Sequence, residues 1–92
     1  MNAYKVCFHA DGMNGSYNFA VVADTLDDAK EKWATFVKTT RAKYFWEKAE
    51  KGMQNHYGGY IVWTDLGVTD KAPGCYEMEY DRWNVGSDHL WD

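Results

Sequence analysis

The stretch that decides the fold is RAKYFWEKAEKG, residues 41–52, in which Tyr44, Phe45 and Trp46 stand side by side among charges. Neighbours on an α-helix are turned by about 100°, so three consecutive rings cannot all face one core. With Trp33 as the reference, one apolar stripe falls within about 60° of it and holds Leu26, Ala29, Phe36, Val37, Thr40 and Tyr44. A second apolar face lies almost opposite and holds Phe45, Trp46, Ala49 and Met53.

Two arrangements are compatible with these two faces. In the first, the chain breaks near residues 39–42, where Thr39 and Thr40 are weak helix formers and Thr40 could N-cap a new helix. A second short helix then turns Phe45 and Trp46 back onto the core. In the second, the helix runs straight and exposes its second face, and an exposed apolar patch of this kind usually marks an interface.

The ends of the helical region are marked by local signals. Thr25 is a good N-cap, and Asp28 at the third helical position approximates a capping box, so we expect the helix to begin near Leu26. Gly52, with lysines at 48 and 51 before and beside it, is the expected stop.

Period-two alternation predicts strands on either side of this region. Residues 3–9 and 17–23 alternate across a loop of turn formers, which predicts a β-hairpin. Residues 60–67 and 74–83 predict a second pair of strands. The order β-β-α-β-β predicts an α+β fold in one domain, residues 1–92: a four-stranded antiparallel sheet with a long helix, straight or broken, on one face. The strand residues expected under the helix are Tyr4, Val6, Phe8, Tyr17, Phe19 and Val21.

The overall charge limits the classes of partner. The net charge of −4 disfavours direct binding to a nucleic acid, whose phosphates require Lys and Arg, and is compatible with a basic protein partner. The first residues lack the features of a signal peptide, and no apolar run has the length of a membrane span. We therefore expect a cytoplasmic protein without a membrane partner, with Cys7 and Cys75 as free thiols, although spacing alone leaves a bridge between them open.

An acidic row is predicted on the last strand. Glu77, Glu79 and Asp81 occupy alternate positions and therefore project from one strand face. Such a row either is simply solvated or imitates nucleic-acid phosphates towards a basic groove on another protein, where it would steer encounter more than it adds affinity.

The residues that could carry catalysis do not form a recognisable set. Cys7 and His9 share a strand face, but zinc requires four ligands and the chain has no C-x-x-C. Glu77 and Glu79 resemble the paired acids of a hydrolase without an evident pocket. The chain also lacks a glycine-rich phosphate loop. We therefore expect no enzyme activity, catalytic residue, metal or cofactor.

The N-terminal hairpin followed by ADTLDDAKEKW, residues 23–33, resembles a module of small phage and bacterial proteins. In size, acidity and aromatic content the chain is similar to phage-encoded inhibitors, including anti-CRISPR proteins. That resemblance is one of overall character and assigns no site residue. It implies a non-enzymatic inhibitor of a nucleic-acid-handling complex, located in the host cytoplasm if phage-encoded.

The expected function is therefore a protein-binding module that uses an aromatic patch and the acidic strand face. Its candidate binding residues are Arg41, Phe45, Trp46, Met53, Tyr57, Glu77, Glu79 and Asp81. One alternative is a homodimeric structural or adaptor protein that pairs through the same helix patch. The other is a small enzyme that uses Cys7 as a thiol or Glu77 and Glu79 as carboxylates.

Overall fold

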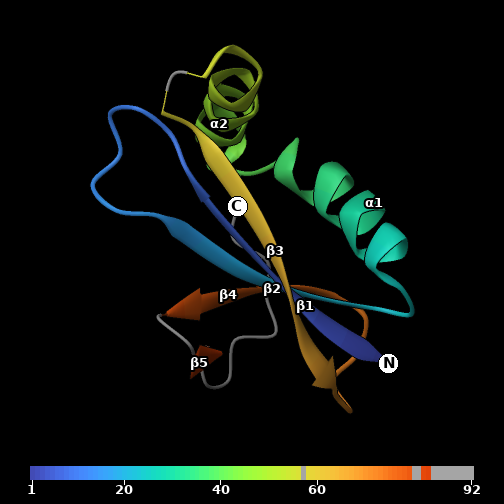
Figure 1. The fold of residues 1–92 in the computed structure, drawn as a ribbon. Helices are drawn as coiled ribbons and strands as arrows, with labels where there is room; N and C mark the ends of the chain where they lie inside the picture. The colour runs from blue at the N-terminus through green and yellow to red at the C-terminus, as the bar shows by residue number, and fades with distance from the viewer. Residues whose placement is uncertain (57, 80–81, 84–92) are drawn as a thin grey trace.

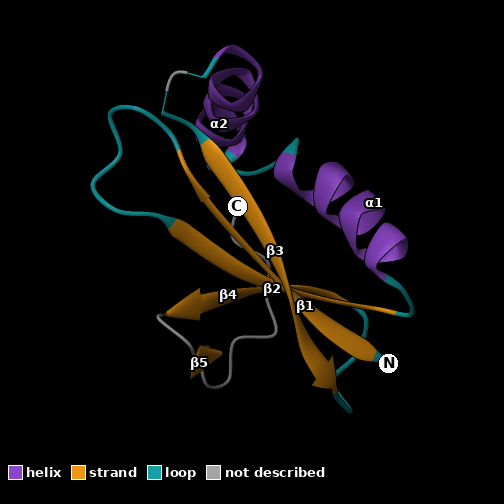
Figure 2. Cartoon of the chain, in the orientation of Figure 1, coloured by secondary structure: helices purple, strands orange, loops and turns teal. Residues whose placement is uncertain are grey.

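The computed structural model of the chain describes residues 1–56, 58–79, 82 and 83. Two helices lie against one face of an antiparallel sheet (Figures 1 and 2). Along the chain the elements are β1 (Asn2–His9), β2 (Tyr17–Ala23), α1 (Leu26–Val37), α2 (Lys43–Asn55), β3 (Tyr60–Val68), β4 (Gly74–Glu79) and β5 (Arg82–Trp83). The predicted α+β fold is confirmed, with two helices in place of one long helix and a short additional strand.

The strands follow the order β3-β1-β2-β4-β5 across the sheet. In the β1–β2 hairpin Val6 is opposite Phe19 and Tyr4 is opposite Val21, so the two predicted inner faces lie on the same side. This side is buried under the helices and centred on Trp33, which is 1% exposed. The Trp33 ring centroid lies 4.9 Å from that of Phe19, so aromatic contacts join α1 to the sheet.

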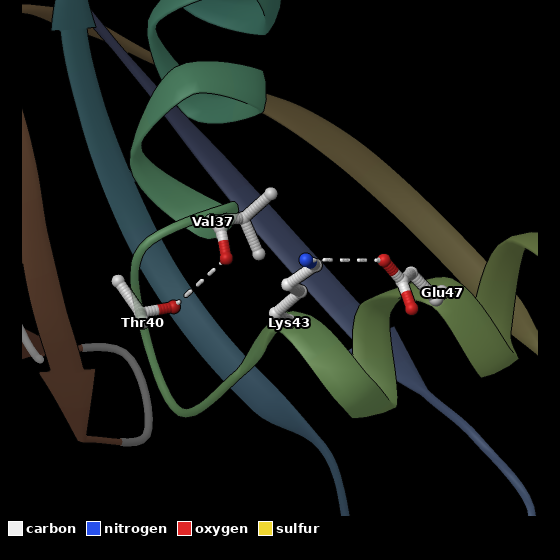
Figure 3. A network of polar contacts seen from close by, with 4 residues as sticks. All are labelled: Val37, Thr40, Lys43 and Glu47. Carbon is white, nitrogen blue, oxygen red and sulfur yellow. Dashed lines mark hydrogen bonds and ion pairs between the residues drawn. The ribbon is translucent and has the colours of Figure 1, made fainter.

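The helical region is broken, as the first of the two arrangements requires. The helix α1 ends at Val37 and α2 begins at Lys43. Between them the Thr40 hydroxyl donates to the Val37 carbonyl oxygen at 3.3 Å (Figure 3) and accepts the Ala42 N–H at 3.2 Å. Thr40 thus stabilises the turn. It is not the N-cap of α2, because Ala42 occupies that position and makes no side-chain cap bond.

The break changes which rings face the core. Trp46 packs edge-on against Phe8, with ring centroids 5.2 Å apart, and Phe45 packs against Tyr17 at 5.7 Å. The placement of Tyr44 in the core stripe was wrong, because its side chain is 61% exposed. The five residues of the turn reset the helical phase, so α2 buries the face that a straight helix would expose.

The helix ends match the sequence signals in part. Thr25 caps α1 as predicted, since its hydroxyl accepts the Asp28 N–H at 3.1 Å. The predicted stop at Gly52 was wrong: α2 continues to Asn55, and His56 adopts the left-handed conformation with φ 60° and donates its N–H to the Gly52 carbonyl. Gly52 is instead buried within α2.

A close approach fixes α2 at the beginning of β3. A Cβ added at Gly59 would lie 2.5 Å from the Ala49 carbonyl oxygen and 2.9 Å from the Ala49 Cα, both backbone atoms. Only glycine fits between the helix and the strand here. Figure 1 shows the same arrangement, with β3 starting beside α2 and its arrowhead lying away from that helix.

Candidate functional site

A groove of about 460 Å³ lies between α1, α2 and β3. Its lining is mainly apolar and comprises Trp33, Ala34, Trp46, Met53, Ile61 and Trp63. Lys30 of α1 and Glu50 of α2 add one charge of each sign. The groove therefore combines three tryptophans with a small number of charged groups, a composition typical of binding surfaces.

Each wall of the groove comes from a different element. Trp33 of α1 is buried, and its ring centroid lies 5.3 Å from that of the half-buried Trp46 of α2. Met53, two turns further along α2, is 46% exposed. Ile61 and Trp63 are two positions apart on β3, so both half-buried side chains lie on the helix side of the sheet.

Trp33, one of the lining residues, has a buried indole N–H. Among the described side chains it is the buried nitrogen or oxygen without a hydrogen-bond partner. An unsatisfied buried donor costs about 1–3 kcal/mol. One of the residues that line the groove therefore carries a buried donor whose hydrogen-bonding capacity is unused.

The strand that forms one wall of the groove is at the edge of the sheet. In the part of the chain that the structure describes, β3 pairs with β1 on one side and has no neighbour on the other. On the face away from the helices Tyr60 is 44% exposed and Val62 is 49% exposed. The backbone N–H and C=O groups along this edge are a template for another strand.

A bulge limits the regular part of the edge. The pairing with β1 shifts register between Tyr4, which is opposite Asp65, and Ala3, which is opposite Gly67. The Asp65 carboxylate accepts the Gly67 N–H at 2.7 Å, and Gly67 has φ +91°, a conformation that favours glycine. Residues 60–65 therefore form the regular edge, and Val68, 86% exposed, lies beyond the bulge.

The predicted aromatic patch is divided by the fold. Trp46 and Met53 line the groove, whereas Phe45 is turned towards Tyr17. Arg41 is exposed in the turn between the helices. Tyr57 lies outside the described residues.

Only the first member of the predicted acidic row has a described side chain. Glu77 is opposite Phe19 in the β2–β4 register and is half-buried on the helix side of the sheet. The side chain of Glu79 and the whole of Asp81 lie outside the described residues. Tyr76 and Met78, on the other side of β4, are buried in a second apolar cluster with Ala3, Ala20 and Val22.

The thiols lie on opposite faces of the sheet. Cys7 is opposite Val62 on the face away from the helices, whereas Cys75 is opposite Val21 on the helix side. Both are free, so the bridge that spacing left open does not form. Burial raises the pKa of the Cys75 thiol to about 12, while nearby Lys32 acts in the opposite direction.

Cys7 and His9 lie on the same face of β1, as the alternation predicts. Cys75 and Glu77 lie on the other face of the sheet, on β4, which pairs with β2. The His9 ring instead stacks on Tyr60, with centroids 5.6 Å apart. Residues 1–56, 58–79, 82 and 83 contain no cluster of three or more His, Cys, Asp or Glu side chains that could hold a metal ion.

Sequence reasoning did not identify Ile61, Trp63 or the β3 edge as part of a site. The run YIVW, residues 60–63, is apolar at every position, so both faces of this strand are apolar. It does not show that the strand is at an edge, because this depends on strand order.

Neither described helix is long and apolar enough to cross a membrane. No family model, curated protein or solved structure matches the chain.

Proposed function

We propose that this chain is a non-enzymatic protein-binding module that takes up an extended segment of a partner protein along β3. The observation that carries the proposal is that the open edge of β3 is also one wall of the apolar groove. Backbone pairing and side-chain burial can therefore act on the same bound segment. This combination is the usual basis of recognition by strand addition.

Strand geometry determines which side chains of such a segment would enter the groove. A strand paired with β3 lies about 4.8 Å from it and points alternate side chains to opposite faces of the sheet. Every second side chain would then lie on the helix side, next to Ile61 and Trp63 and facing Met53 across the groove. The other side chains would lie beside Tyr60 and Val62 on the opposite face. Main-chain hydrogen bonds would supply affinity, and the groove would select apolar residues at alternate positions.

The charge of the chain indicates which kind of partner to expect. The net charge of −4 favours encounter with a basic protein. Together with the resemblance to phage-encoded inhibitors, this supports a nucleic-acid-handling protein complex as the target. Binding would inhibit the complex by occupying one of its extended segments.

The test is selection from a displayed library of random peptides. We expect the selected peptides to carry apolar residues at alternate positions. Met53→Glu, in the groove, and Val62→Lys, at the edge, should each weaken their binding about tenfold or more, as expected for central interface residues. Val68→Lys is the matched control, because this side chain is 86% exposed beyond the bulge.

Two results would refute the proposal. The first is that the library yields no binder of the folded protein. The second is that the selected peptides bind Met53→Glu and Val62→Lys as tightly as the original protein, with circular dichroism showing each variant folded. Both substitutions are at exposed positions, so the core should not be affected.

A further inference from the structure

Over residues 60–64, the β3 edge lacks the features that usually prevent sheet edges from pairing. Natural edge strands are often short or carry Lys or Pro. The strand β3 has nine residues, YIVWTDLGV, without Lys, Arg or Pro. Its bulge protects only the end beyond Asp65. Within the described part of the chain, no strand pairs with the outer side of residues 60–65, and their side chains are mainly apolar.

We propose that in the free protein this edge pairs antiparallel with β3 of a second copy of the chain, about a two-fold axis at Val62. The inference rests on the proposed function to the extent that it concerns the same edge and groove, but it requires no other partner. In this register Val62 is opposite Val62 of the second copy, Ile61 is opposite Trp63, and Tyr60 is opposite Thr64. The pairing is isologous, since both copies use the same surface.

The alternation of side chains limits which registers are allowed. Directly opposite residues of an antiparallel pair lie on the same face, so a two-fold axis through the joined sheet must pass at a residue and not between two residues. An axis at Val62 joins a β-branched pair on one face and places Ile61 against Trp63 twice on the groove side. An axis at Trp63 would instead place the Asp65 carboxylate opposite Ile61, next to the groove. The Val62 register leaves Asp65 outside the apolar pairs.

The position of α2 favours the antiparallel direction. This helix lies at the start of β3, where Gly59 contacts the Ala49 backbone. Antiparallel pairing keeps the helices of both copies on one face of the joined sheet and places the two copies of α2 at opposite ends of the joined strands. Parallel pairing of the same edges would turn the helices of the second copy, and with them its Ile61 and Trp63, to the opposite face. In the antiparallel pair each groove receives Ile61 and Trp63 of the other copy along its open side.

The contact is small, so we expect a weak dimer whose fraction rises with protein concentration. A six-residue strand contact is below the size of a standard stable interface. The dimer is therefore a reversible cover for the edge. A partner segment whose side chains fit the groove more closely than Ile61 and Trp63 would displace the second copy. The product would be a complex of one copy of this chain with its partner.

Sedimentation at several protein concentrations tests the proposal, with the original protein and with variants that carry opposite charges at position 62. We expect the protein to shift from monomer to dimer as concentration rises. Val62→Lys and Val62→Glu should each raise the dissociation constant of the dimer about tenfold or more, because like charges would be directly opposite. A mixture of the two variants should recover the dimer, because Lys of one copy then faces Glu of the other. Val68→Lys should dimerise like the original protein.

The outcomes decide both the interface and its register. A monomer at every concentration would overturn the proposal, as would a dimer that both Val62 variants leave unchanged. A dimer weakened by each variant but not recovered by their mixture would overturn the Val62 register. Peptide binding without a dimer would leave the proposed function intact, and a dimer without peptide binding would leave only this inference.

Discussion

Cys75 and Cys7 differ in their surroundings because they occupy opposite faces of the sheet. Cys75 faces α1 and is buried, with its pKa raised to about 12 by loss of solvation. The sequence alternation places Cys75 and Glu77 on one side of β4, which the structure confirms, but does not say which side the helices cover. That side is decided by the pairing of Cys75 with Val21, a contact between strands far apart in the sequence.

The raised pKa predicts how stability depends on pH. The ordinary pKa of this thiol is 9.0 and its folded value is about 12, so between these values the unfolded chain loses the proton while the folded chain keeps it. The unfolded state then binds fewer protons, and the contribution of Cys75 to the free energy of unfolding falls as pH rises, by up to about 1.4 kcal/mol per pH unit. Below pH 9 this contribution is fully present.

Denaturant unfolding of the original protein and Cys75→Ala at a series of pH values measures this contribution. Other groups also titrate in alkaline solution, so the informative quantity is the difference between the two proteins. We expect the stability advantage of the original protein to shrink as pH rises above 9. Parallel curves for the two proteins would contradict the effect of burial on Cys75.

At the scale of the elements, the two helices show what periodicity predicts and where it fails. Within α1 the stripe prediction is correct for Ala29, Trp33, Phe36 and Val37, but not for Leu26, which is exposed in the first turn. It fails at Tyr44 because a helical wheel assumes one continuous phase, and the turn at Thr40 interrupts it. The weak helix formers at 39 and 40 show where a break could occur. They do not decide whether it occurs, because the burial of Trp46 against Phe8 and Trp33 stabilises the broken form.

The assignment of Trp46 and Tyr44 to opposite sides of α2 can be tested by stability. Trp46→Ala removes a ring that packs on Phe8 and Trp33, so we expect the free energy of unfolding to fall by about 3 kcal/mol. Tyr44→Ala, at a position 61% exposed, should cost less than about 1 kcal/mol. Denaturant titration of both variants gives the comparison. Equal losses, or a larger loss for Tyr44→Ala, would indicate the continuous helix instead.

At the scale of the whole molecule, the binding site depends on strand order more than on any single residue. The strands themselves are predictable, from the alternation in residues 3–9 and 17–23 and from the β-branched and aromatic content of residues 60–67. Their order is not, because it is set by contacts between distant segments. The sequence for this reason does not predict the groove. It indicates Met53 and Trp46 on α2, but Ile61 and Trp63 join them only because β3 lies beside β1 at the edge.

The order of strands also predicts a gradient of hydrogen exchange across the sheet. The strands β1 and β2 are each paired on both sides, β1 by β2 and β3 and β2 by β1 and β4, so their amides should exchange most slowly. In dilute protein, the amides of residues 60–65 that point away from β1 should exchange fast. At high protein concentration these amides should slow, because the second copy covers them, while residues beyond the bulge keep their rates. The test is to measure amide hydrogen exchange by NMR at a low and a high protein concentration. In Val62→Lys, the outward-pointing amides of residues 60–65 should exchange fast at both concentrations. Rates in β3 that do not change with concentration would mean that its edge stays open, as required of a site that only a different protein occupies.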